Sequence, residues 1–241
     1  MTKARTYPRR GLHGAVVHEI GVRIVRGELG SGDLLPAEDE LSEELTASRT
    51  VLREAIKVLA AKRLVESRPK TGTRVRPRRD WNLLDPDVLA WQLEAGPDRR
   101  FLEQALELRR LVEPGAVRLA AERATDEQIA ALEEAHRAME AAGENLEAFM
   151  EPDLRFHTIL YEACHNELLE HMSGILNAVL RILFSYPARP PGAYARAVRD
   201  HGAILEAIRD HDPDAAEAAL LALVDETSAS VEWAARHGWG E

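Results

Sequence analysis

Apolar residues recur every three or four positions along almost the whole chain, a spacing typical of amphipathic helices. Residues 64–68 and 73–76 are the exception, because apolar and polar side chains alternate there as they do in strands. The intervening residues 69–72 (PKTG) are typical of a turn. The pattern predicts a mainly α protein with one small hairpin. A membrane-spanning helix needs about 18 consecutive apolar residues, and no run in this sequence approaches that length, so we expect no membrane partner.

The composition is that of a folded protein without disulfides. Of the 241 residues, 45% are hydrophobic and 30% are charged, which excludes an intrinsically disordered chain. Cys164 is the single cysteine, so no intramolecular disulfide can form. The basic N-terminus lacks the apolar run of a signal peptide. These features predict a cytoplasmic protein that is long enough for one large or two modest domains.

Charge is divided unevenly along the chain. Residues 1–80 carry 17 Lys and Arg against 11 Asp and Glu, whereas residues 81–241 carry 14 against 30. The net charge of −10 therefore hides a basic N-terminal segment. We expect this segment to bind a polyanion such as DNA and the acidic remainder to have another role.

Residues 1–76 are predicted to form a winged helix-turn-helix. A first helical pattern ends at the glycine-rich residues 27–32, Pro36 begins a second helix, and Ser48 caps a third. Three helices followed by a hairpin make this fold, whose third helix enters the DNA major groove. Arg49, Arg53 and Lys57 stand four apart on that helix and share one face. A solvated basic face is the alternative reading of this stripe.

The rest of the chain predicts a linker over residues 77–84 and a second domain over residues 85–241. Helical patterns cover residues 85–95, 99–123, 126–142, 146–164, 166–186, 194–211 and 213–236. Since strand signals are lacking there, we expect an all-α antiparallel bundle of six or seven helices.

Several motifs resemble those of one family of transcription regulators. In the N-terminal segment these are residues 35–41 (LPAEDEL), 48–55 (SRTVLREA) and 71–73 (TGT). They are similar to the winged helix of the GntR family. In the helical segment the motifs are residues 108–114 (LRRLVEP), 153–157 (DLRFH), 201–208 (HGAILEAI) and 212–216 (DPDAA). They resemble the FCD effector domain of the FadR subfamily, and residues 81–91 (WNLLDPDVLAW) resemble the branch with the galactonate repressor, whose members sense sugar acids.

The resemblance implies which residues read DNA. Arg49 and Arg53 would contact it from the third helix and Gly72 from the tip of the wing, while Ser48 and Thr50 are candidates for phosphate contacts. An arginine fits this role because its guanidinium bonds guanine or phosphate through two nitrogens. Ser48 has the alternative role of a helix cap alone.

Two positions depart from the family pattern. Asp39 stands where family members commonly have an arginine, which removes a DNA contact and leaves the operator sequence open. Arg63 stands where they have a glycine, and it is a further candidate for a phosphate contact.

A metal site is predicted in the helical segment. Asp153 and His157 are four residues apart, so on a helix they project from one face and suit zinc or another divalent metal. By itself this spacing is more often that of a solvated face or a hydrogen-bonded pair than of a metal site. The resemblance to FCD domains implies that both residues are ligands together with His201. The histidine that usually completes the site falls on Leu223, and nearby Glu226 is a better substitute than Asp225, which points elsewhere. Such a site leaves a coordination position open for water or an effector.

The resemblance also implies a small carboxylate effector, which needs a positive partner in a buried site. Arg109, four residues before Glu113, is the first candidate and Arg181 the second. A structural salt bridge, for example to Glu113 or Asp200, is the alternative for each.

These features predict a ligand-responsive regulator rather than an enzyme. We expect a homodimer that binds operator DNA through two winged helices and represses until a carboxylate or sugar acid binds. Two alternatives are a helical metal-dependent hydrolase, for which no general base or nucleophile stands out, and an architectural DNA-binding protein without an effector.

Overall fold

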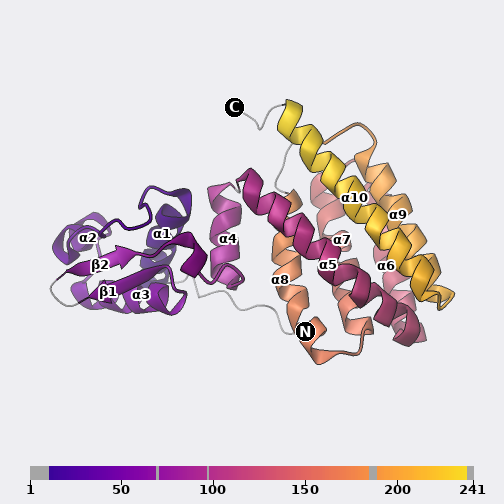
Figure 1. Cartoon of the computed structure of the whole chain (residues 1–241), viewed down its shortest axis with the longest axis horizontal. Coiled ribbons are helices and arrows are strands. Elements are labelled where there is room, and N and C mark those ends of the chain that lie inside the picture. Colours follow the sequence, from indigo (N-terminus) through magenta and orange to yellow (C-terminus); the bar gives the residue numbers. More distant parts are fainter. Residues whose placement is uncertain (1–10, 69–70, 97, 185–188, 238–241) are drawn as a thin grey trace. The chain divides into compact units, whose positions relative to one another are not determined.

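The computed structural model describes residues 11–68, 71–96, 98–184 and 189–237, which fold into two compact units (Figure 1). The second unit begins at Asp98. The mainly α fold predicted from the sequence is confirmed, with a small hairpin in the first unit and a helical bundle in the second. No helix in the described ranges combines the length and the apolar character needed to span a membrane.

The first unit is a winged helix-turn-helix followed by one more helix. Its elements are α1 (Leu12–Arg26), α2 (Glu38–Glu44), α3 (Arg49–Ala61), β1 (Val65–Arg68), β2 (Gly72–Val75), the 3-10 helix η1 (Arg78–Asp80) and α4 (Pro86–Ala95). The two strands are antiparallel, with Val65 opposite Val75 and Arg68 opposite Gly72. Buried residues of the first three helices, among them Ile20, Leu41 and Leu52, form the core under the hairpin.

Local sequence explains where these helices begin and end. Gly27 ends α1 in the left-handed conformation at φ 80°, which glycine adopts without a steric penalty. The side chain of Ser48 accepts a hydrogen bond from the backbone N–H of Val51 at 3.3 Å, so it caps α3. Arg63, just beyond α3, also has a left-handed φ of 64°. This conformation explains why a glycine suits that position in the family pattern.

A third extended segment, residues 32–35, lies beside the hairpin. The backbone N–H of Leu35 donates to the carbonyl oxygen of Thr73 at 2.8 Å, and that of Val75 donates to Asp33 at 2.9 Å. This pairing is not predictable from the sequence, because the segment is too short and too rich in turn residues to show a strand pattern.

Helix α4 packs within the first unit, although the sequence analysis placed residues 85–97 in the second domain. The indole Nε1 of Trp91 donates to His18 Nδ1 at 3.1 Å, which ties α4 to α1. At the start of α4, Asp85 and Asp87 accept from the Lys62 ammonium, which follows α3, at 2.8 and 2.5 Å. The boundary therefore falls between α4 and α5 in the structure. These partners are far apart in the sequence, so periodicity alone does not reveal them.

The contact between α1 and α4 gives a stability prediction. Gly21 lies against the ring of Trp91, and a Cβ at that position would come within 2.7 Å of three ring atoms. We expect Gly21→Ala to lower the free energy of unfolding by about 1–3 kcal/mol, because the indole and α1 must shift apart. Urea denaturation followed by tryptophan fluorescence measures this change.

Gly115→Ala is the matched control, since its Cβ would meet nothing within 4 Å inside helix α5. We expect this substitution to stabilise the protein by about 0.5–1 kcal/mol through helix propensity. Equal stability changes in the two variants would contradict the close packing of α4 on α1.

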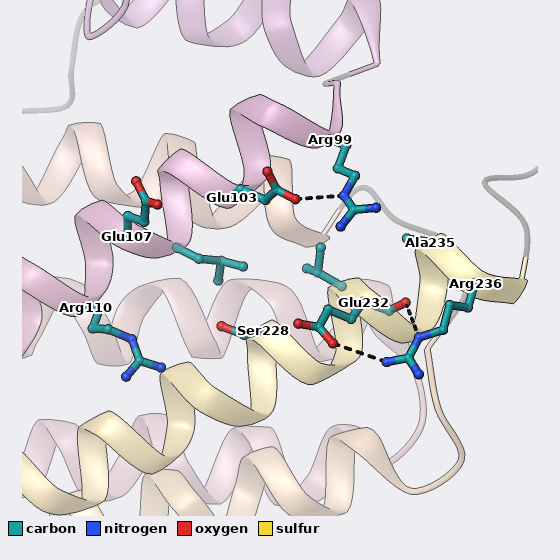
Figure 2. Close-up of a pocket in the computed structure, with 10 residues that line it drawn as sticks. Arg99, Glu103, Glu107, Arg110, Ser228, Glu232, Ala235 and Arg236 are labelled. Carbon is teal, nitrogen blue, oxygen red and sulfur yellow. Dashed lines mark hydrogen bonds and ion pairs between the residues drawn. The ribbon is translucent and has the colours of Figure 1, made fainter.

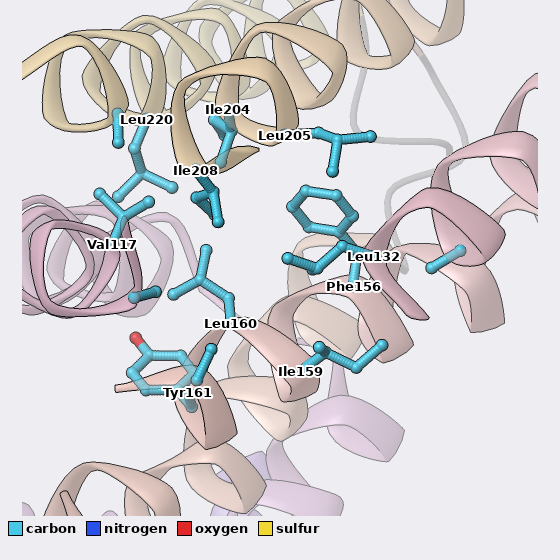
Figure 3. Close-up of a cluster of buried hydrophobic side chains, with 14 of the residues drawn as sticks. Val117, Leu132, Phe156, Ile159, Leu160, Tyr161, Ile204, Leu205, Ile208 and Leu220 are labelled. Carbon is cyan, nitrogen blue, oxygen red and sulfur yellow. The ribbon is translucent and has the colours of Figure 1, made fainter. Parts of the chain in front are cut away.

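The second unit is a bundle of six helices in the described residues. They are α5 (Arg99–Arg123), α6 (Asp126–Ala142), α7 (Leu146–Ala163), α8 (Glu167–Phe184), α9 (Ala193–Arg209) and α10 (Pro213–His237). Helix α10 packs on α5 and α9, and α7 packs on α5, α6 and α8. Figure 3 shows the core between them, where Ile204 and Ile208 of α9 face Leu132 of α6 and Phe156 of α7. The helices of this bundle match the predicted ranges closely.

Candidate DNA-binding surface and metal site

Three potential metal ligands meet inside the helical bundle. Asp153 and His157 lie one turn apart on α7, and His201 lies on α9. All three side chains are buried, with relative exposures of 4%, 1% and 1%. One ligand atom from each lies within 4.8 Å of the others. The structure thus brings together the three residues that the sequence analysis named as metal ligands.

The hydrogen bonding of His201 orients its ring for this role. Its Nδ1 lies 2.7 Å from the carbonyl oxygen of Ala197, which can only accept, so Nδ1 carries the proton. The lone pair is then on Nε2, which lies 3.3 Å from Asp153 Oδ1. A hydrogen bond from the other ring nitrogen to a carbonyl oxygen commonly fixes the tautomer of a metal-binding histidine.

Several polar atoms at this site are buried without a hydrogen-bond partner in the described part of the chain. They are Asp153 Oδ2, His157 Nδ1 and His201 Nε2, with the Tyr161 hydroxyl one turn further along α7. Each such atom costs about 1–3 kcal/mol if nothing bonds it. Ligand atoms left unpaired in a cluster are what a metal site requires, so these residues fit a divalent cation.

The charges at the site are also suited to a cation. Burial lowers the pKa of His157 to about 4, so the imidazole is neutral at pH 7 and able to bind a metal. Burial alone would raise the pKa of Asp153, but the neighbouring histidines and Arg109 hold it below the usual value. Asp153 is therefore an anion at neutral pH.

Helix α10, which the structure describes from Pro213 to His237, adds no fourth ligand to the cluster. Leu223 is buried in the apolar core, as expected from its side chain. Glu226, which the sequence analysis kept as a substitute, instead accepts from Arg196 Nε at 2.6 Å. Asp225 pairs with Arg110 on α5. Since neither carboxylate belongs to the cluster of three, the cation would keep open coordination positions.

Arg109, the first effector candidate, forms an ion pair inside the bundle. Its Nε and Nη2 donate to the two carboxylate oxygens of Glu113 at 2.8 and 3.2 Å, and both residues are buried. Burial alone would raise the pKa of Glu113, but Arg109 lowers it. Glu113 also lies 3.8 Å from His157 Nδ1. This geometry corresponds to the salt bridge considered as the alternative for Arg109.

Arg181, the second candidate, is paired as well. Its guanidinium lies 2.8 Å from Glu151 of α7, and 40% of the arginine side chain is exposed. Arg189 was not among the candidates predicted from the sequence. It lies between α8 and α9, and its buried Nε has no hydrogen-bond partner among the described residues. No helical pattern surrounds that arginine in the sequence, so periodicity gives no signal for it.

The predicted DNA-reading residues lie on the exposed surface of the first unit. Arg49 and Arg53 on α3 are 65% and 63% exposed, and they pair with the α2 carboxylates of Asp39 at 2.6 Å and Glu38 at 3.0 Å. Thr50 is exposed beside them, and Gly72 is exposed at the start of β2 with a φ of 94°. Ser48 uses its side chain as the cap of α3.

A separate hollow of about 570 Å³ lies between α5 and α10 (Figure 2). Its charged residues are largely paired with one another, since Arg99 bonds Glu103 at 2.7 Å and Arg236 bonds Glu232 at 3.2 Å. Asp153, His157 and His201 do not line it. It is therefore distinct from the candidate metal site.

Comparison with known proteins agrees with both halves of this description. Residues 12–75 match the family of bacterial regulatory proteins named gntR, and residues 104–226 match the FCD domain. The galactonate operon transcriptional repressor of Escherichia coli K12 is 40% identical over 210 residues, which cover 87% of this chain and 92% of that protein.

Two further relatives extend the similarity. The transcriptional repressor NanR of Escherichia coli K12 is 32% identical over 99% of this chain and 89% of its own length. The structure of a GntR protein from Streptococcus agalactiae superposes with a TM-score of 0.50 at 25% identity, covering 90% of this chain and 99% of that one. By its two domain matches and its 40% identity to a curated relative, the chain belongs to the GntR family of DNA-binding transcription regulators, in the FadR subfamily with an FCD domain, and not to a family of enzymes.

Proposed function

We propose that this chain is a dimeric repressor that leaves its operator when a small carboxylate of the sugar-acid class binds in the helical bundle. The observation that carries the proposal is the buried cluster of Asp153, His157 and His201, with ligand atoms that lack hydrogen-bond partners among the described residues. Similarity to a repressor of a galactonate operon supports both the direction of control and the class of ligand. A repressor of this kind would act in the cytoplasm, where its operator DNA lies.

The three side chains would hold a divalent metal, of which zinc suits the nitrogen and oxygen donors. Such a cation, when bound, supplies a Lewis-acidic position for an oxygen of the effector. His201 is kept in the binding tautomer by Ala197, and Asp153 contributes the negative charge. The apolar side chains around them exclude water, as the 5.0 Å edge-to-face contact of Phe156 with the His201 ring illustrates.

Repression and release follow from a difference in affinity. The dimer would have two arrangements, of which only one fits the operator. The effector must bind the other arrangement more tightly, because equal affinities for the two would not change their populations. Two winged helices related by the dimer symmetry would occupy two half-sites. Arg49 and Arg53 would contact the bases or phosphates in the major groove, with Thr50 and Ser48 near the backbone and Gly72 at the wing.

The DNA-binding half makes a direct prediction. We expect Arg49→Ala and Arg53→Ala each to weaken operator binding by about 10- to 100-fold, because each removes a two-nitrogen contact to DNA. Fluorescence anisotropy on an operator duplex selected from random DNA measures the loss. Zinc and ligand binding should stay unchanged, since these residues lie in the other unit.

Arg99→Ala serves as the matched control, because Arg99 is also an exposed arginine in the first turn of a helix and pairs with a neighbouring carboxylate. We expect its operator affinity to equal that of the wild type. Normal affinity in both Arg49→Ala and Arg53→Ala would contradict the assignment of α3 as the recognition helix.

The architectural alternative predicts a bundle that only joins two subunits. A bundle with that role alone has no need of buried ligand atoms without partners, and each of them destabilises it. The cluster therefore favours a ligand sensor over this alternative.

Thermal melting tests the sensor directly. Chelator-stripped protein is melted with galactonate, gluconate and other sugar acids, with and without zinc. A ligand that binds the native state raises the melting temperature by mass action. We expect a rise that requires both a sugar acid and zinc. A rise independent of zinc would contradict the metal-assisted site, and no response to any acid would contradict the ligand class.

A further inference from the structure

Arg189 differs from the other arginines of the bundle. Its Nε is buried and has no hydrogen-bond partner, which is true of no other arginine nitrogen in the described part of the second unit. By contrast, Arg109 is bonded by Glu113 and Arg181 lies 2.8 Å from Glu151. The ion pairs among the described residues include none that neutralises Arg189. Its charge is therefore available to a ligand.

Aromatic rings hold this guanidinium in place. Its central carbon lies 4.8 Å from the ring centre of Phe184 at the end of α8 and 5.3 Å from that of Tyr194 at the start of α9. Cation–π contacts of this kind orient an arginine without hydrogen-bonding its nitrogens. The planar donor edge stays free to bond a second group, such as a carboxylate.

The same rings connect Arg189 to the metal site. Phe149 of α7 packs against Phe184 and Tyr194, with ring centres 6.2 and 5.2 Å apart. Phe149 stands four residues before Asp153, so the two side chains project from one face of α7. Arg189 and the cluster of Asp153, His157 and His201 therefore lie toward the same face of that helix.

Electrostatics agree with this placement. The charge of Asp153 acts on Arg189, although burial as the larger effect lowers the pKa of the guanidinium from its usual value. The Arg109–Glu113 pair is neutral as a whole. With a divalent cation held by Asp153, the region would carry excess positive charge and favour an anion.

We propose that Arg189 binds the carboxylate of the effector, while another oxygen of the same molecule binds the metal that Asp153, His157 and His201 would hold. The inference rests on the proposed function and adds a recognition element to it. The ligand is then a hydroxylated carboxylate, selected against the neutral sugar or polyol of the same shape. Arg109, the candidate from the sequence, has a structural role instead.

Isothermal titration of zinc-loaded full-length protein tests the assignment, with galactonate and its uncharged counterpart galactitol as probes. We expect the wild type to bind galactonate more tightly than galactitol. Arg189→Met should lower galactonate affinity by about 10- to 100-fold, the effect of losing a charged hydrogen-bonded partner. The zinc affinity of the variant should equal that of the wild type. Arg118→Met, which removes an arginine of the same unit that is paired with Asp214 and Glu217, is the matched control and should bind galactonate normally.

The possible outcomes separate this inference from the proposed function. Normal galactonate binding by Arg189→Met overturns the role of Arg189 and leaves the sensor intact. Equal wild-type affinity for galactitol also overturns it. If the wild type binds none of galactonate, gluconate, lactate and citrate, both proposals fail. If Arg189→Met also loses zinc affinity, the same titration is made with Arg189→Lys, because this variant keeps a positive charge beside the rings of Phe184 and Tyr194. The proposal then requires weaker galactonate binding at unchanged zinc affinity.

Discussion

Glu113→Gln is expected to lower the free energy of unfolding by about 3–5 kcal/mol, because it leaves the buried Arg109 charge without its partner. Both side chains are almost fully inaccessible, and two nitrogens of the arginine bond two oxygens of the glutamate. Glutamine fills nearly the same volume, so the variant isolates the charge from the packing. Urea denaturation of metal-free protein, followed by circular dichroism, measures the change.

Two controls make this measurement specific. The double variant Arg109→Met with Glu113→Leu removes both charges, and we expect its stability to lie within about 1 kcal/mol of the wild type or above it. Glu217→Gln breaks the pair with Arg118, whose side chains are both 38% exposed, and should cost less than about 1 kcal/mol. A stable Glu113→Gln variant would contradict the structural role of the pair. Loss of galactonate binding by a stable double variant would restore Arg109 as the effector ligand.

Asp153→Asn has the largest expected effect on metal binding. The substitution removes the only carboxylate of the cluster and its charge, while the side chain keeps its shape. We expect zinc affinity to fall by about 100-fold or more, since even residues that only orient metal ligands are worth about 10- to 100-fold. Competition with a chromophoric chelator measures the affinity.

Glu151→Gln is the control for this variant, because Glu151 lies on the same helix two residues earlier and is 66% exposed. Its zinc affinity should equal that of the wild type. If Asp153→Asn binds zinc as the wild type does, the cluster is not the metal site.

Local patterns in the sequence were sufficient for much of this fold. Apolar periodicity predicted the helices of the bundle, because each buries one continuous face. The cap at Ser48 and the helix end at Gly27 were also predictable, since these depend on neighbouring residues alone. The placement of α4 was not predictable, because Trp91 contacts His18 and Gly21, which lie 73 and 70 residues earlier in the chain.

The candidate site shows the same division. The spacing of Asp153 and His157, combined with the family resemblance, was sufficient to predict a cluster that includes His201. The choice among arginines was not predictable, because it depends on which guanidinium already has a carboxylate partner. Arg109 and Arg181 are paired in the structure, whereas the unpaired Arg189 follows α8 and lies outside any helical pattern.

The central claim is that a carboxylate bound at the metal site of the second unit releases DNA from the first. Fluorescence anisotropy of the zinc-loaded wild type on its selected operator, titrated with galactonate, tests it most directly. A coupling of ordinary size predicts an operator Kd raised by about 5- to 150-fold in the wild type, and no change in Asp153→Asn. An unchanged operator Kd in the presence of a carboxylate that demonstrably binds the wild type would contradict the claim, as would an equal response in Asp153→Asn.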